Sequence, residues 1–173
     1  MLLAQYDVGR TFLNLALSSR RIEPEHEGKG FAATSTGTGS YSIQRRLASP
    51  FTIGILGHRR VSYSLFGSNA YYVETRNGVM GMFPVRDRFA ATFQAETGTN
   101  TYPVPVRVGA KDLKRVDDAT TVGGGIAVRL YRAAALATAV TVTKYDSNIP
   151  GFTRTVTQAV MTFRVSYSKD FFQ

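Results

Sequence analysis

Residues 153–168, TRTVTQAVMTFRVSYS, are the stretch that decides the fold. Apolar and polar side chains alternate along it, with Ala159, Met161, Phe163, Val165 and Tyr167 on one face. The other face carries Gln158, Thr162, Arg164, Ser166 and Ser168, with Val160 as an apolar intrusion. This period of two, together with the Thr, Val and aromatic content, predicts a β-strand.

The predicted strand is long for its chain. About 16 residues at roughly 3.3 Å each would span about 50 Å. A compact chain of 173 residues is only about 40 Å across. We therefore expect this strand to bend, to carry a bulge or to reach beyond its own domain.

The segment before it completes a long C-terminal hairpin. Residues 137–145 are rich in Thr and Val and are joined to the last strand by DSNIPGF at 146–152. Further upstream, residues 126–140 are ambiguous, because Ile126, Val128 and Leu130 alternate as in a strand while RAAALA favours a helix. We favour the strand.

The middle of the chain reads as a meander. Residues 51–66 predict one long strand, or two strands broken at Gly57, and residues 88–96 predict another. In AYYVETRNGVMGMFPV (70–85), Asn77-Gly78 lies between alternating apolar residues and predicts a hairpin turn.

The connections on either side of these strands have their own signals. Pro103 and Pro105 place residues 101–108 at a sheet edge, because proline donates no hydrogen bond to a neighbouring strand. Residues 110–118, AKDLKRVDD, are the best candidate for a short helix. Residues 10–19 alternate as a strand.

The expected fold is therefore all-β. We expect a single domain over 1–173, built as an antiparallel barrel or sandwich from a meander plus the long C-terminal hairpin. Extended elements should project from it, namely an N-terminal arm at 1–9 and a small-residue loop at 29–43, with at most one or two short helices.

Composition limits the chemistry. The formal charge is +9, with 21 basic residues against 12 acidic ones, which favours polyanionic partners. The chain contains no cysteine, which removes disulfides and thiolate catalysis. The N-terminus lacks the basic segment of a secretion signal, and no apolar run is long enough to span a membrane.

No constellation of residues predicts catalysis, a cofactor or a metal. His26 lies close to Glu23 and Glu25, but on a segment broken by Pro and Gly and without a second histidine at ligand spacing. Asp117-Asp118 lies beside Lys114 and Arg115, which predicts a salt-bridge cluster at a helix end. No nucleophile-elbow motif is present in the sequence.

Arginine pairs and tyrosines are the candidate contact residues. Either the arginines contact phosphate, or they pair with acidic groups within or between subunits, including the acidic segment 23–27. The tyrosines would offer stacking surfaces for single-stranded nucleic acid, or simply pack in the sheet. The set comprises Arg20, Arg21, Arg45, Arg46, Arg59, Arg60, Tyr63, Tyr71 and Tyr72.

Three classes of function follow, in order. The first is a non-enzymatic, self-assembling structural protein such as a capsid, decoration or tail component of a virion. Its partners would be copies of itself and other assembly proteins, and it would reside in the virion or, before assembly, in the cytoplasm of the producing cell. The second is a nucleic-acid-binding β-barrel that uses the arginine pairs and tyrosines. The third is a small-ligand barrel or an enzyme, which would need a deep pocket with convergent titratable groups.

Overall fold

The computed structural model describes residues 2–23, 33–47, 51–64, 69–86, 88–131 and 134–165, and these residues form strands without helices. The strands of the main sheet are β1 (Leu2–Val8), β2 (Thr11–Ile22), β3 (Thr34–Arg46), β4 (Thr52–Tyr63), β5 (Tyr71–Arg86), β6 (Phe89–Thr101), β9 (Val116–Tyr131), β10 (Ala134–Ser147) and β11 (Arg154–Val165). A separate hairpin consists of β7 (Val106–Val108) and β8 (Lys111–Leu113).

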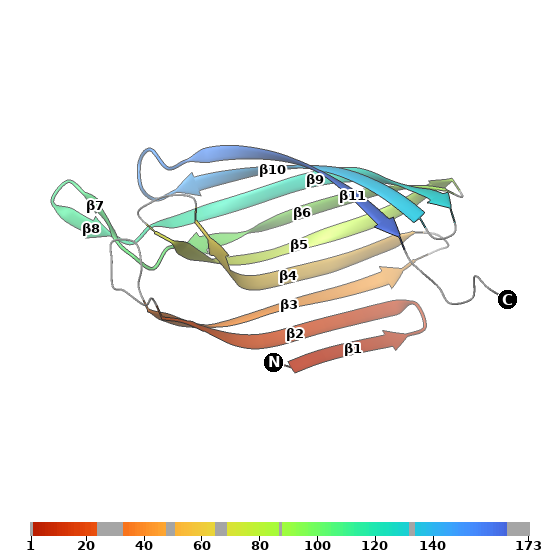
Figure 1. Ribbon diagram of the computed structural model, residues 1–173, viewed down its shortest axis with the longest axis horizontal. Coiled ribbons are helices and arrows are strands. Elements are labelled where there is room, and N and C mark those ends of the chain that lie inside the picture. The colour runs from red at the N-terminus through yellow and green to blue at the C-terminus, as the bar shows by residue number, and fades with distance from the viewer. Residues whose placement is uncertain are drawn as a thin grey trace.

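The main sheet is a nine-stranded antiparallel meander. Its strand order is β1-β2-β3-β4-β5-β6-β9-β10-β11, so each strand pairs with its neighbour in sequence except where the β7–β8 hairpin is inserted. Figure 1 shows these strands side by side, with the β7–β8 hairpin projecting beyond one end of the sheet. The all-β prediction and the C-terminal hairpin are confirmed. The sheet is open rather than closed into a barrel, because β1 and β11 form its two edges.

The predicted hairpin at Asn77-Gly78 is wrong. Strand β5 runs through both residues without turning, with Asn77 opposite Gly57 of β4 and Thr97 of β6. A two-residue turn there would need positive φ at both positions. Among the described residues positive φ occurs at Gly9, Gly109 and Gly151 instead, and these three glycines lie at turns. Continuous pairing with two neighbours therefore overrides the local turn signal.

Two other local expectations are also corrected. Residues 111–113 form strand β8 and 116–118 begin β9, so the expected helix at 110–118 is absent. The expected edge strand at 101–108 divides into the end of β6, a connection and β7.

The expected projecting elements belong to the sheet. The N-terminal arm at 1–9 is largely strand β1, paired with β2. Residues 34–43 of the expected loop at 29–43 lie within β3, between β2 and β4; residues 29–32 lie outside the described residues. Strand formation at 126–140 is confirmed, with β9 ending at Tyr131 and β10 beginning at Ala134.

The buried core is small and unusually polar. Among the described residues, the buried apolar side chains are Tyr71, Tyr102, Ala119 and Ile149. The buried polar or charged ones are Asn69, Glu74, Arg76, Asn100, Arg115 and Asp117. A single sheet has nothing to pack against along most of its area. Apart from Gly57 and Gly81, which lie under aromatic rings, burial is therefore concentrated at one end, where connections contribute Asn69, Tyr102, Arg115 and Ile149.

Candidate functional site

One face of the nine-stranded sheet is predominantly apolar. Directly paired residues on adjacent strands share a face, so the strand register traces this surface across the whole sheet. One row of paired residues, running from β1 to β10, is apolar throughout: Tyr6, Leu13, Ile43, Ile55, Val79, Ala95, Val122 and Val142. We call the surface that contains this row the apolar face, and the opposite surface the polar face.

The described part of the chain leaves most of the apolar face uncovered, although Tyr71 at one end of this face is buried. Val79 and Ile55 near its centre are each 47% exposed. Other exposed large side chains that the register places on this face are Leu2, Tyr6, Val8, Leu17, Ile43, Ile53, Tyr63, Phe89, Phe93, Val122, Ile126, Val140, Val142, Met161, Phe163 and Val165. The exposed large apolar side chains that the register places on the polar face are Leu3, Met82, Val156 and Val160.

Aromatic rings lie over glycines on the apolar face. Tyr41 is paired with Gly57, and its hydroxyl donates a hydrogen bond to Asn77 Oδ1 at 3.0 Å. A Cβ built on Gly57 would lie 2.7 Å from Tyr41 Cζ, so the glycine makes room for the ring. Phe93 covers Gly81 in the same way. These rings fill the space over the glycines, as aromatic residues paired with glycines do in other sheets.

The polar face carries a shallow groove of about 380 Å³. Its walls come from strands β3 to β10 and include Gln44, Met80, Gln94 and Thr141. The residues that line it contain no titratable side chain. This groove therefore offers hydrogen bonds and thioether contacts, but not the convergent acids and bases of a catalytic pocket.

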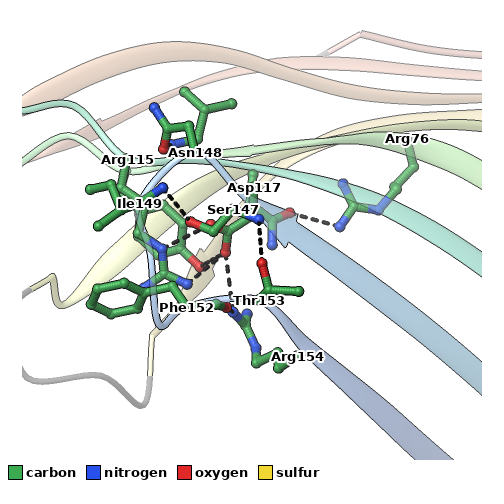
Figure 2. A network of polar contacts seen from close by, with 12 residues as sticks. Arg76, Arg115, Asp117, Ser147, Asn148, Ile149, Phe152, Thr153 and Arg154 are labelled. Carbon is green, nitrogen blue, oxygen red and sulfur yellow. Dashed lines mark hydrogen bonds and ion pairs between the residues drawn. The ribbon is translucent and has the colours of Figure 1, made fainter.

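One end of the polar face holds a buried ionic cluster centred on Asp117 (Figure 2). Arg115 donates two hydrogen bonds to this carboxylate, from Nε at 2.8 Å and from Nη2 at 2.6 Å. Tyr102 and Arg154 each donate another, both at 3.1 Å. Asp117 and Arg115 are 0% and 1% exposed as side chains, so four donors satisfy a charge that water does not reach.

The guanidinium of Arg115 is also held between two rings. Its Cζ lies 4.2 Å from the centroid of Tyr102 and 4.1 Å from that of Phe152. Figure 2 shows Phe152, on the turn between β10 and β11, beside Arg115. The arginine thus joins the start of β9 to the β10–β11 turn through cation–π contacts.

A second cluster on the polar face is centred on Glu74 of β5. Its carboxylate accepts hydrogen bonds from Arg60 Nε at 2.9 Å and Ser62 Oγ at 3.1 Å. His58 Nε2 and Arg76 Nη2 lie 3.6 Å and 3.5 Å from it. Arg76 in turn donates to Asn100 Oδ1 at 2.7 Å, which connects β5 to β6.

These contacts set the protonation of both carboxylates. Burial by itself raises the pKa of Glu74, but hydrogen bonds and charges from His58, Arg60 and Arg76 outweigh it and hold the pKa at about 2. The pKa of Asp117 is lowered in the same way, because Arg115 and Arg154 outweigh the effect of burial. Burial raises the pKa of Tyr102, which therefore remains a hydrogen-bond donor. Both clusters are fixed, fully ionised links between strands.

The predicted arginine pairs lie on strands β2, β3 and β4, and neighbouring residues of each pair point to opposite faces. Arg21 forms an ion pair with Glu23, as the intramolecular interpretation predicts, and Arg60 pairs with Glu74. Arg59 donates to Gly37 O and Thr75 Oγ1, both at 3.2 Å.

The remaining arginines of the set are placed as follows. Arg20 Nη2 donates to Tyr63 Oη at 3.4 Å, Arg46 lies over the Phe12 ring at 6.0 Å, and Arg45 is exposed. The six arginines are therefore spread over three strands and both faces.

The three predicted tyrosines do not form one platform. Tyr63 is 75% exposed, whereas Tyr71 is 2% exposed. Tyr72 stacks on Tyr102, with ring centroids 5.3 Å apart. The sequence interpretation missed Tyr102 and Phe152 as partners of Arg115, because contacts between a strand start and a distant turn leave no local pattern.

Metal-binding and membrane-spanning features are absent from the described residues. Those residues include no group of three or more His, Asp and Glu that could hold a metal ion. His26 and Glu25 lie outside them. The same residues include no helix long and apolar enough to cross a membrane.

Comparison with known proteins identifies no relative of this chain. No protein family, curated protein or solved structure matches this chain.

Proposed function

We propose that this protein is a non-enzymatic structural subunit that assembles with copies of itself. A virion component, such as a capsid, decoration or tail protein, is the kind of assembly we propose for it. The single observation that carries the proposal is the exposed apolar face, which spans the sheet from β1 to β11. Soluble monomers rarely leave so large an apolar surface in water.

The size of the face suits a second copy. Nine strands about 4.8 Å apart, each about 40 Å long, give a face of roughly 1,500 Å². Two such faces in contact would bury about 3,000 Å², which is within the range of obligate homodimers. Sheets pack in this way at about 10 Å separation, with interdigitated apolar side chains.

The total surface of the chain supports the same conclusion. It exposes 12337 Å², whereas a compact monomer of 19.0 kDa exposes roughly 8,400 Å². The buried core described above contains more polar than apolar side chains. Packing against another copy would provide the apolar core that the single sheet lacks.

A viral shell or tail fits this design because it is built from many identical subunits in repeated contacts. Each subunit can leave a face uncovered until its neighbour arrives. Nucleic-acid binding stays the alternative prediction. No described contact favours it, since Arg21 and Arg60 are already paired with carboxylates and Tyr71 is buried.

Sedimentation equilibrium over a wide concentration range tests the proposal. We expect the wild-type chain to sediment as a dimer or larger species. Val79→Lys, at the centre of the apolar face, should weaken association at least tenfold. Met82→Lys is the matched control, because Met82 lies on the same strand, is similarly exposed at 41% and faces the other way. A wild-type monomer at all concentrations, or equal effects of both variants, would contradict the proposal.

A further inference from the structure

The outer side of strand β11 has no partner in the described part of the chain. β11 comprises 12 residues, pairs with β10 on one side and ends the strand order of the sheet. An edge strand of this length presents a row of backbone N–H and C=O groups to any strand that can approach. Most natural edges carry features that prevent such pairing.

The central part of β11 lacks these protective features, because its two charged residues, Arg154 and Arg164, lie near its ends. Residues 155–163, TVTQAVMTF, contain no charged residue, no proline and no glycine. High β-propensity combined with low charge and no proline is the composition of segments that add to one another as strands. The other edge differs in length, because β1 has only seven residues.

The sequence of β11 complements itself. When two copies run antiparallel about Val160, Ala159 lies opposite Met161 and Thr157 opposite Phe163, while Gln158 lies opposite Thr162. In this central part apolar side chains thus meet apolar or small ones and polar meets polar, whereas further out Val156 lies opposite Arg164. Met161 and Phe163 are 72% and 62% exposed, so both are available for such contacts. A two-fold axis at Val160 would relate the two copies, so each contact between two different residues would occur twice.

We infer that β11 pairs antiparallel with β11 of a second copy and so joins two nine-stranded sheets into one continuous sheet. The inference takes self-assembly from the proposed function, but it concerns a different surface. Face packing buries the apolar face, whereas edge pairing satisfies backbone groups. Together, the two contacts would link copies into species larger than a dimer.

The absence of cysteine allows a direct test. Val160→Cys places a thiol opposite its own copy, and paired antiparallel residues have Cα atoms about 4.5–5.5 Å apart, a separation that a disulfide spans. Under mild oxidation we expect nearly complete covalent dimers. Leu3→Cys is the control, because Leu3 is exposed on the same face at the other edge of the sheet. Random collision would link both variants equally, and that result would overturn the inference.

A second experiment uses charge. Val160→Lys and Val160→Glu should each block the species larger than the face-packed dimer, and mixing the two variants should restore them. If neither variant changes the distribution of species, edge pairing through β11 is wrong. These outcomes are separable from those of Val79→Lys, because failure of face packing leaves the Val160→Cys cross-link intact. Cross-linking of Leu3→Cys alone would instead assign the contact to β1.

Discussion

Arg115 and Asp117, two residues apart at the start of β9, form a bidentate ion pair that is almost completely shielded from water. Tyr102 and Arg154 complete the coordination of the carboxylate. The pair therefore ties the connection after β6 and the start of β11 to the same point. A sheet with so little apolar core depends on such links for its local order.

Removing the charge of Asp117 should be costly. Asp117→Asn preserves the side-chain shape but leaves the buried Arg115 guanidinium without its counter-charge, so we expect a loss of about 3–5 kcal/mol in unfolding free energy. Chemical denaturation at one fixed protein concentration measures it. Asp118→Asn is the matched control, because this neighbour is exposed on the opposite face and should change stability by less than about 0.5 kcal/mol. Equal losses would show that the cluster is not a structural link.

Glu74 should make the free energy of unfolding depend on pH in the acid range. Its pKa is about 2 in the folded chain and 4.5 as an ordinary glutamate, so the unfolded chain binds the proton first as the pH falls. The stabilisation is therefore complete above about pH 4.5 and is lost as the pH drops towards 2. The free energy of unfolding falls by at most about 3 kcal/mol over this range.

Denaturation midpoints between pH 6 and pH 2.5 would measure this contribution. Glu74→Gln should lower stability at pH 6 and flatten the decline between pH 4.5 and 2.5. Glu96→Gln, on the neighbouring strand β6, should keep the wild-type decline. An unchanged acid profile in Glu74→Gln would contradict the assigned ionisation.

Gly98 should not tolerate a side chain. A Cβ at this position in β6 would run into the carbonyl oxygen of Thr75 and would lie 2.9 Å from Arg76 Cα. Backbone atoms in a central strand cannot move aside without breaking the sheet. Gly98→Ala should therefore cost about 1–3 kcal/mol in unfolding free energy.

Gly37→Ala provides the comparison for Gly98. Gly37 lies in β3, and a Cβ there meets nothing within 4 Å. Alanine restricts the unfolded chain, so this variant should match the wild type or gain up to about 1 kcal/mol. Similar thermal midpoints for the two alanine variants would contradict the close approach of β5 to β6 at Gly98.

Sequence alternation predicted the strands that have one apolar and one polar face. It missed β3, because residues 34–40 of this strand are small and do not alternate in this way. Within the predicted strands at 153–168 and 137–145, β11 (Arg154–Val165) and β10 form the expected hairpin, and residues 166–168 lie outside the described residues. Asn77-Gly78 misled because its turn propensity is local, whereas β5 gains pairing along its length with both β4 and β6. Gly9, Gly109 and Gly151 adopt the positive φ of real turns, and their sequence contexts are less distinctive.

For the apolar face, the sequence predicts which residues of a single strand share a side, but not how neighbouring strands align. Leu13, Ile55 and Val79 each lie within an alternating pattern, but their alignment in one row follows from register, which depends on long-range pairing. The Asp117 cluster was expected as a salt bridge at a helix end. The Arg115–Asp117 bridge exists, but on a strand and closed by Tyr102 and Phe152 from distant connections.

Cysteine labelling can measure whether the apolar face is covered in solution. Single-cysteine variants Val79→Cys and Met82→Cys report on the two faces of β5 in a chain that otherwise lacks cysteine. We predict that the maleimide reaction rate at position 79 falls at least tenfold as protein concentration rises from nanomolar to micromolar, while the rate at position 82 stays constant. Equal and concentration-independent rates at both positions would contradict the proposed packing of one copy against another.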